Sequence, residues 1–124
     1  MKYCSISEAA AAFKMSESML RYYERQGLLP LIERDEAGRR IFSEDQMALL
    51  RTVNCLKNTN MQIKQIKQYI DWILEGDTTI ERRLEMMKRH KQAVLDEIAS
   101  MTESLQGIED KITRYTTSME EKQS

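Results

Sequence analysis

Apolar residues recur in the last third of the chain at alternating steps of four and three positions. The series runs from Ile80 to Met119, and eleven of its twelve positions are apolar, with Lys91 the exception. A seven-residue repeat of this length is typical of a coiled coil, in which a second chain covers the apolar stripe of the first. The stripe residues that we assign to a dimer interface are Leu84, Met87, Val94, Ile98, Met101, Leu105, Ile108, Ile112 and Tyr115.

Two short helices are predicted near the start of the chain. Ser5 with Glu8 forms a capping-box pattern, which opens a helix to about Phe13. Ser16 is a suitable N-cap for a second helix, which ends where Gly27 can adopt a left-handed backbone conformation. Two short helices joined by a tight turn are typical of a helix-turn-helix motif.

The helical pattern is absent between Leu31 and Phe42. Turn residues at positions 35–38 separate two short flanks, and we therefore predict a β-hairpin. Its composition suits a wing beside the helix-turn-helix motif.

Two amphipathic helices follow the hairpin. Ser43 with Gln46 repeats the capping-box pattern at the start of the first of them. Asn60 is predicted to end the first of these helices, because Asn tolerates a left-handed backbone conformation. The second helix is predicted to end near Gly76. The residues assigned to the inner side of the first helix are Met47, Leu50, Val53, Cys55 and Leu56.

The composition fits one small folded unit with an extension, because 124 residues are too few for two full cores. No run of 18 apolar residues offers a membrane span, and the first residues lack the basic start and apolar core of a signal peptide. We therefore expect a cytoplasmic protein without a membrane partner. Cys4 and Cys55 are too few for a disulfide framework and are expected to be thiols.

Charge is unevenly divided along the chain. Residues 1–70 contain 11 Lys and Arg against 8 Asp and Glu, whereas residues 71–124 contain 8 against 12. A positive excess in the first half suits a polyanionic partner.

Double-stranded DNA is the polyanion that a helix-turn-helix motif favours, because its second helix enters the major groove. Residues at the start of this helix are placed for base edges, while arginines and phenol groups further along, and the arginines of the hairpin, suit phosphate oxygens. Taken alone, the helix residues also suit a solvated edge beside a packed aromatic. The residues assigned to DNA contact are Ser16, Glu17, Ser18, Met19, Arg21, Tyr22, Tyr23, Arg25, Arg34, Arg39 and Arg40.

The same region carries a resemblance to a known family. Its residues are Leu20–Arg25, Gly27–Pro30, Arg34, Gly38, Arg40 and Phe42–Asp45. This set resembles the MerR family of bacterial transcription regulators, and the likeness extends over the first 75 residues. It implies a winged helix-turn-helix homodimer that binds promoter DNA and distorts it so that RNA polymerase can engage, with activation or repression as the result.

Three residues depart from the family pattern, and one of them is Asn60, which stands where a glycine is usual. Arg39 stands where an aromatic residue is common, and its charge keeps a phosphate contact available. Phe42 stands where a tyrosine is usual and lacks the hydroxyl, so we place it in the core.

Cys55 and its surroundings resemble the aldehyde-responsive, NmlR/AdhR-like branch of the family. The resemblance rests on residues 53–58 and 75–81, and it implies that Cys55 senses reactive electrophiles. A thiolate attacks aldehydes, and a cation such as Lys57 nearby would stabilise it. The alternative is an inert, small apolar residue packed among Val and Leu side chains.

The predicted fold is mainly α with a small β-hairpin wing. A winged helix-turn-helix DNA-binding domain occupies residues 1–75, and a long coiled-coil dimerisation helix occupies residues 78–120. A transcription regulator is the leading interpretation, and a helical coiled-coil adaptor without specific DNA binding is the alternative. The sequence shows no Gly-rich phosphate loop, metal-ligand cluster or nucleophile–base pair, so we expect neither an enzyme nor a metal or cofactor site.

Overall fold

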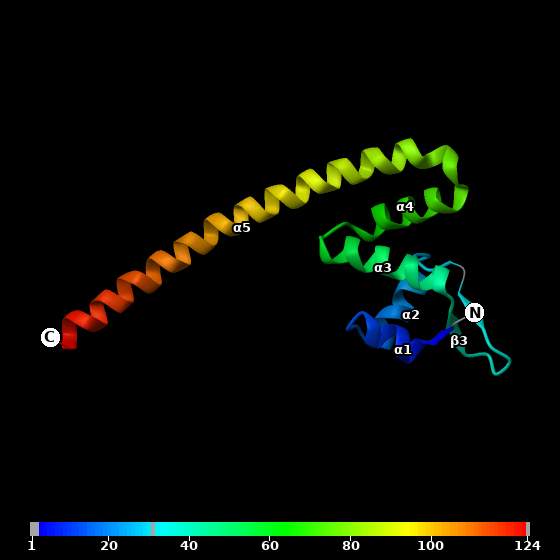
Figure 1. Ribbon diagram of the computed structural model, residues 1–124, viewed down its shortest axis with the longest axis horizontal. Coiled ribbons are helices and arrows are strands. Elements are labelled where there is room, and N and C mark those ends of the chain that lie inside the picture. Colours follow the sequence, from blue (N-terminus) through cyan, green and yellow to red (C-terminus); the bar gives the residue numbers. More distant parts are fainter. Residues whose placement is uncertain (1–2, 31, 124) are drawn as a thin grey trace. The chain divides into compact units, whose positions relative to one another are not determined.

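The computed structural model describes residues 3–30 and 32–123. The chain is mainly helical with one small antiparallel sheet and a long C-terminal helix (Figure 1), which confirms the predicted fold class. It divides into two compact units between Arg83 and Leu84. No helix among the described residues combines the length and apolar character needed to cross a membrane.

The predicted helix-turn-helix motif is formed by α1 (Ile6–Ala12) and α2 (Glu17–Arg25). The capping box at Ser5 is complete, since Ser5 Oγ accepts from the backbone N–H of Glu8 and the Glu8 carboxylate accepts from the backbone N–H of Ser5. Ser16 Oγ accepts from the N–H of Met19 and so caps α2. These local bonds explain why both helix starts could be identified from the sequence.

Gly27 follows α2 in the left-handed conformation, with φ of +79°. A Cβ atom at this position would lie 2.9 Å from Lys67 Cε, near the flexible end of a side chain from α4 (Ile63–Glu75) that can move aside. Glycine therefore suits this turn because of the backbone conformation.

The predicted hairpin consists of β2 (Glu33–Arg34) and β3 (Arg40–Phe42), which pair antiparallel with Glu33 opposite Ile41. A third strand, β1 (Cys4–Ser5), pairs with the other edge of β3. The sequence pattern did not reveal β1, because a two-residue strand is too short to show alternation. Residues 33–42 are called the wing below.

α3 (Glu44–Asn58) begins at the predicted cap, where Ser43 Oγ accepts from the N–H of Gln46. The return bond expected from the Gln46 side chain is absent. Gln46 is instead buried, and its Oε1 has no hydrogen-bond partner among the described residues. Asn60 between α3 and α4 has φ of +66°, as its position predicted.

The assignment of Cys55 to the inner side of α3 is wrong, because its side chain is exposed. The buried stripe of α3 runs through Leu50, Val53 and Leu56. Cys55 lies about 100° around the helix from Leu56, which carries it out of that stripe.

In the core of the first unit, α1 packs against α2 and β3, and α3 packs against α4 and β3. Phe42 is fully buried there, as expected from its missing hydroxyl. The apolar side chains of this core are Ala9, Ala10, Leu20, Tyr23, Leu28, Leu29, Phe42, Leu50, Val53, Leu56, Met61, Ile66 and Ile70.

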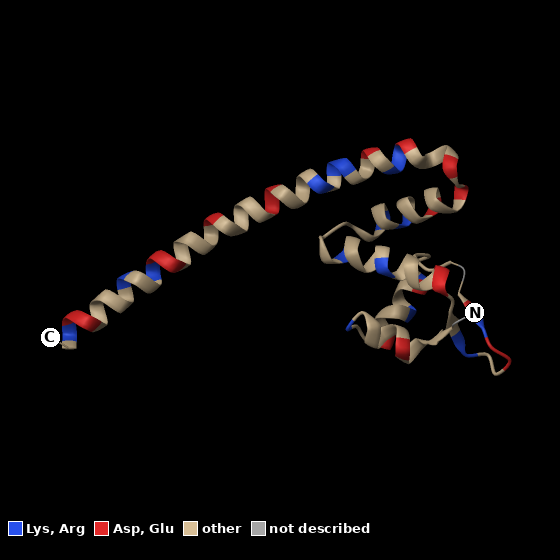
Figure 2. Cartoon of the chain, in the orientation of Figure 1, with Lys and Arg blue, Asp and Glu red and all other residues tan. Residues whose placement is uncertain are grey.

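A 3-10 turn, η1 (Asp77–Thr79), leads into α5 (Ile80–Gln123). α5 is continuous through 44 residues and includes nearly all of the segment predicted as a coiled coil. Acidic and basic residues both occur along its length (Figure 2). No residue of α5 is buried within the single chain.

Candidate nucleic-acid interface

α2 has one face in the core and the other exposed. Leu20 and Tyr23 are buried, whereas Ser18, Met19 and Arg25 are exposed. The helix is therefore fixed by its apolar side and leaves its first turn accessible. This is the arrangement that a helix needs in order to enter a groove of DNA.

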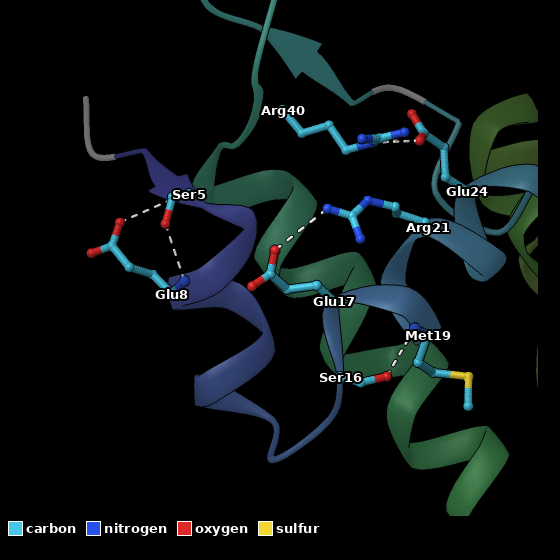
Figure 3. A network of polar contacts seen from close by, with 8 residues as sticks. All are labelled: Ser5, Glu8, Ser16, Glu17, Met19, Arg21, Glu24 and Arg40. Carbon is cyan, nitrogen blue, oxygen red and sulfur yellow. Dashed lines mark hydrogen bonds and ion pairs between the residues drawn. The ribbon is translucent and has the colours of Figure 1, made fainter.

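The residues assigned to base edges lie together in the first turn of α2. Ser16 is exposed but its hydroxyl oxygen is used by the cap to Met19 N. Glu17 is half-buried, and its carboxylate lies 3.5 Å from Arg21 Nη2, a long contact within the helix (Figure 3). Of these four residues, Ser18 and Met19 are therefore the two whose side chains are not used in a cap or an ion pair within α2.

The two adjacent tyrosines have different environments. Tyr22 is 38% exposed, whereas Tyr23 is 4% exposed. Burial, together with the neighbouring Tyr22 phenol, raises the pKa of Tyr23 above its ordinary value. Of the two, Tyr22 is therefore the side chain that a phosphate can reach, and the position of Tyr23 favours packing.

The tip of the wing is organised by Asp35. Its Oδ1 accepts from the backbone N–H groups of Ala37 and Arg39, and its Oδ2 lies 3.1 Å from Arg39 Nε. These bonds, led by the backbone N–H of Arg39, hold the pKa of Asp35 below its ordinary value. Arg34 closes the same turn by donating to the Gly38 carbonyl at 2.9 Å.

Arg40 differs from the other wing arginines because it contacts α2. Its Nε donates to Glu24 Oε1 at 2.7 Å, and the two side chains are 24% and 26% exposed (Figure 3). The sequence pattern predicts a DNA contact for Arg40 and no role in the site for Glu24. Only the packing of the wing against α2 brings these two residues together.

Cys55 lies on the exposed side of α3, outside α2 and the wing. Side chains one helical turn apart share a face, so Arg51 lies on the same side of the helix as Cys55. Lys57, the cation suggested by the sequence, is only two residues away and faces another direction. Among the described residues, no group of three or more His, Cys, Asp or Glu side chains is suited to holding a metal ion.

The apolar stripe on α5 is accessible in the single chain. Leu84, Ile98, Met101, Leu105, Ile108, Ile112 and Tyr115 each expose more than half of their surface, and Met87 and Val94 are half-buried. Exposed apolar patches of this extent mark interaction surfaces in soluble proteins.

Comparison with known proteins supports the same interpretation. Residues 4–72 match the family described as "MerR HTH family regulatory protein". An uncharacterized HTH-type transcriptional regulator of Haemophilus influenzae is 37% identical over 109 residues, covering 88% of this chain and 81% of the relative. The HTH-type transcriptional regulator AdhR of Bacillus subtilis is 29% identical over 92 residues, covering 74% of this chain and 66% of AdhR.

A solved structure extends the similarity to the long helix. The crystal structure of HiNmlR, described as a MerR family regulator lacking the sensor domain and bound to promoter DNA, matches with a TM-score of 0.85 at 34% identity. The match covers 94% of this chain and 92% of HiNmlR. Together these similarities confirm the resemblance to the NmlR/AdhR-like branch, and the chain belongs to the MerR family of helix-turn-helix transcription regulators.

Proposed function

We propose that this regulator binds double-stranded promoter DNA through α2 and the wing. The observation that carries the proposal is the accessible face of α2, with Met19, Arg21 and Tyr22, in a chain whose wing holds three further arginines. HiNmlR was crystallised on promoter DNA and is similar over nearly the whole chain, which supports the same partner here. Such a partner places the protein in the cytoplasm.

The residues proposed to contact DNA divide into two roles. Ser18 and Met19, at the start of α2, are suited to base edges in the major groove. Arg21, Tyr22 and the wing arginines are suited to phosphate oxygens, which fix the position of the helix without reading the sequence. The DNA-binding domain is accordingly residues 1–75.

Dimerisation through α5 is the second part of the proposal. An exposed helix with a continuous apolar stripe is stable in water only when another surface covers it. A second copy of residues 78–120 offers a stripe of the same spacing. A homodimer also supplies two DNA-binding units for two related half-sites.

The dimer would act on transcription by distorting the promoter. Bending or twisting DNA costs energy that many phosphate contacts must offset, and two winged units provide such contacts on both sides of the promoter. RNA polymerase then engages the distorted promoter. Activation or repression of transcription depends on the spacing of the promoter elements. Membership of the MerR family supports this part of the proposal.

The most specific part of the proposed function is the sensing of electrophiles by Cys55. The exposed thiol is accessible to a small aldehyde, unlike the inert, buried cysteine of the alternative. Addition forms a bond between sulfur and the carbonyl carbon, while the thiol proton passes to the carbonyl oxygen. Arg51, one helical turn away, places a positive charge on the same face of α3.

In vitro transcription tests this function. Purified RNA polymerase would transcribe from the promoter next to the protein's own gene, with wild type, Cys55→Ser or Cys4→Ser and with or without formaldehyde. We expect an aldehyde response that is lost in Cys55→Ser and kept in Cys4→Ser. An unchanged response in Cys55→Ser would reject sensing by this thiol and leave DNA binding intact.

Membership of a family of transcription regulators argues against the adaptor alternative and against an enzyme. The salt dependence of DNA binding supplies a direct test, because phosphate contacts release counterions. An apolar contact between coiled coils would show no steep dependence. Binding to promoter DNA that stays constant between low and high salt would reject the DNA-binding proposal.

A further inference from the structure

The ion pair between Glu24 and Arg40 connects the helix of the helix-turn-helix motif to the wing. The two residues are 16 positions apart, on α2 and β3. Four further ion pairs among the described residues join side chains four positions apart. They stabilise a single helix or turn, whereas the Glu24–Arg40 pair fixes one DNA-contacting element against another.

The geometry of this pair leaves most of the Arg40 guanidinium free. Arg40 uses Nε to bind Glu24, and its two Nη groups make no hydrogen bond within the described part of the chain. Those groups carry four N–H donors in one plane, an arrangement that matches two oxygens of a phosphate. Because Nε is hydrogen-bonded to Glu24, the plane of the Arg40 guanidinium is already fixed in the protein without DNA.

A carboxylate beside a DNA-binding surface has an electrostatic cost. Glu24 brings negative charge close to Arg21 and Arg40, where phosphates are expected to bind (Figure 3). A glutamate without a role at this position would only weaken binding. Its short, partly buried contact with Arg40 offsets that cost by ordering the guanidinium and the wing together.

We propose that Glu24 is a positioning residue for DNA binding. It orients Arg40 for a bidentate contact with a backbone phosphate, and it holds the wing in a fixed position against α2. The inference rests on the proposed DNA-binding function and adds to it a residue that never contacts DNA directly. It also makes Arg40 distinct from Arg39, whose guanidinium is anchored at the tip of the wing by Asp35.

Glu24→Ala tests the inference, because charge and positioning predict opposite results. Removing a negative charge near DNA should tighten binding, whereas losing the orientation of Arg40 should weaken it. Glu36→Ala is the matched control, since Glu36 lies exposed at the tip of the same wing and makes no ion pair within the described residues. The measurement is fluorescence anisotropy with labelled duplexes, one carrying the promoter of the protein's own gene and one of unrelated sequence.

We expect Glu24→Ala to weaken binding to both duplexes about tenfold, and Glu36→Ala to leave it unchanged or tighter. In an Arg40→Ala background, Glu24→Ala should cause no further loss. Tighter binding by Glu24→Ala, or an equal loss with and without Arg40, would overturn the inference.

Arg40→Lys gives an independent test if Glu24→Ala is poorly folded in thermal melts. Lysine keeps the charge but lacks the planar fork, so we expect nearly the loss caused by Arg40→Ala. Binding equal to wild type would show that charge alone suffices. Wild-type protein that binds neither duplex in a salt-dependent manner would reject the DNA-binding function itself, whereas wild-type binding without the variant pattern would reject only the role of Glu24.

Discussion

The Thr79 hydroxyl oxygen lies 2.6 Å from the Trp72 carbonyl oxygen, which ties the start of α5 to the end of α4. The same hydroxyl lies 2.8 Å from the Gly76 carbonyl and accepts from Arg83 Nε at 3.1 Å. Arg83 also donates to the Gly76 carbonyl through Nη2 at 3.0 Å. Thr79 is almost completely buried, so these bonds form away from competing water.

Thr79→Val should therefore destabilise the protein. The change keeps the shape but removes the hydroxyl's bond to the Trp72 carbonyl and the acceptor of Arg83 Nε, at a cost of about 1–3 kcal/mol. Thermal unfolding at fixed protein concentration measures the effect. Thr78→Val is the control, because Thr78 is exposed and should change stability little. Equal melting temperatures for the two variants would contradict the role given to Thr79.

Gln46→Met should stabilise the protein or leave its stability unchanged. The buried Oε1 has no partner among the described residues, and removing an unsatisfied polar atom recovers about 1 kcal/mol. Methionine has a similar length and adapts to the same space. Chemical denaturation of this variant, with the exposed Gln65→Met as control, gives the comparison. Destabilisation confined to Gln46→Met would indicate that a bound water satisfies Oε1.

The wing should lose stability in acid through Asp35. Backbone N–H bonds, above all from Arg39, hold the pKa of Asp35 below its ordinary value in the folded protein. A depressed pKa gives a stabilising contribution that is complete above the unfolded value, about pH 4, and is lost as the pH falls through the folded value. NMR titration of the Ala37 and Arg39 amides should report this loss.

Two variants isolate the contribution of Asp35. Asp35→Asn should remove the acid-dependent shift of the wing amides, because the titrating group is gone. Glu36→Gln should preserve it, since Glu36 makes no hydrogen bond with the turn among the described residues. A wing titration that persists in Asp35→Asn would assign it to another group.

Arg21→Ala should weaken binding to promoter DNA and to unrelated DNA by similar factors. A phosphate contact carries no sequence information, and its loss should lower the slope of log K against log salt by about 1. Arg89→Ala, a loss of charge on exposed α5, is the matched control. A loss limited to one base position in the promoter would instead assign Arg21 to base recognition.

Leu105→Asp combined with Ile108→Asp should convert dimers to monomers and reduce promoter affinity. Both side chains are more than half exposed in the single chain, and burying two carboxylates in a coiled-coil seam is strongly unfavourable. Ala99→Asp combined with Gln106→Asp adds the same charge away from the stripe. Multi-angle light scattering distinguishes the two states, and a dimeric Leu105/Ile108 variant would show that the stripe is not the interface.

Features that depend on neighbouring residues could be predicted from the sequence. The caps at Ser5 and Ser16 involve residues three positions away, and Gly27 and Asn60 take left-handed conformations suited to their own chemistry. The long periodicity of α5 likewise needs only the spacing along one helix. Caps and turns of this kind can be predicted because any other local conformation would cost more free energy than contacts with distant residues can recover.

Features that depend on packing between elements could not be predicted. Strand β1 exists because β3 offers a free edge, and Tyr23 rather than Tyr22 is buried because of how α2 meets the core. Cys55 was placed inward because its neighbours are apolar, although its angle around α3 points it to solvent.

The sequence by itself determined the order of the helices, the hairpin, the caps and the coiled-coil spacing, since these arise from contacts within a few residues. Tertiary structure alone decided that Glu24 binds Arg40 and that Thr79 joins α4 to α5. The Glu24–Arg40 pair spans 16 positions, and the Thr79 bond depends on how the chain turns at Gly76. Neither can be read from periodicity, because contacts between elements depend on how the backbone is arranged in three dimensions.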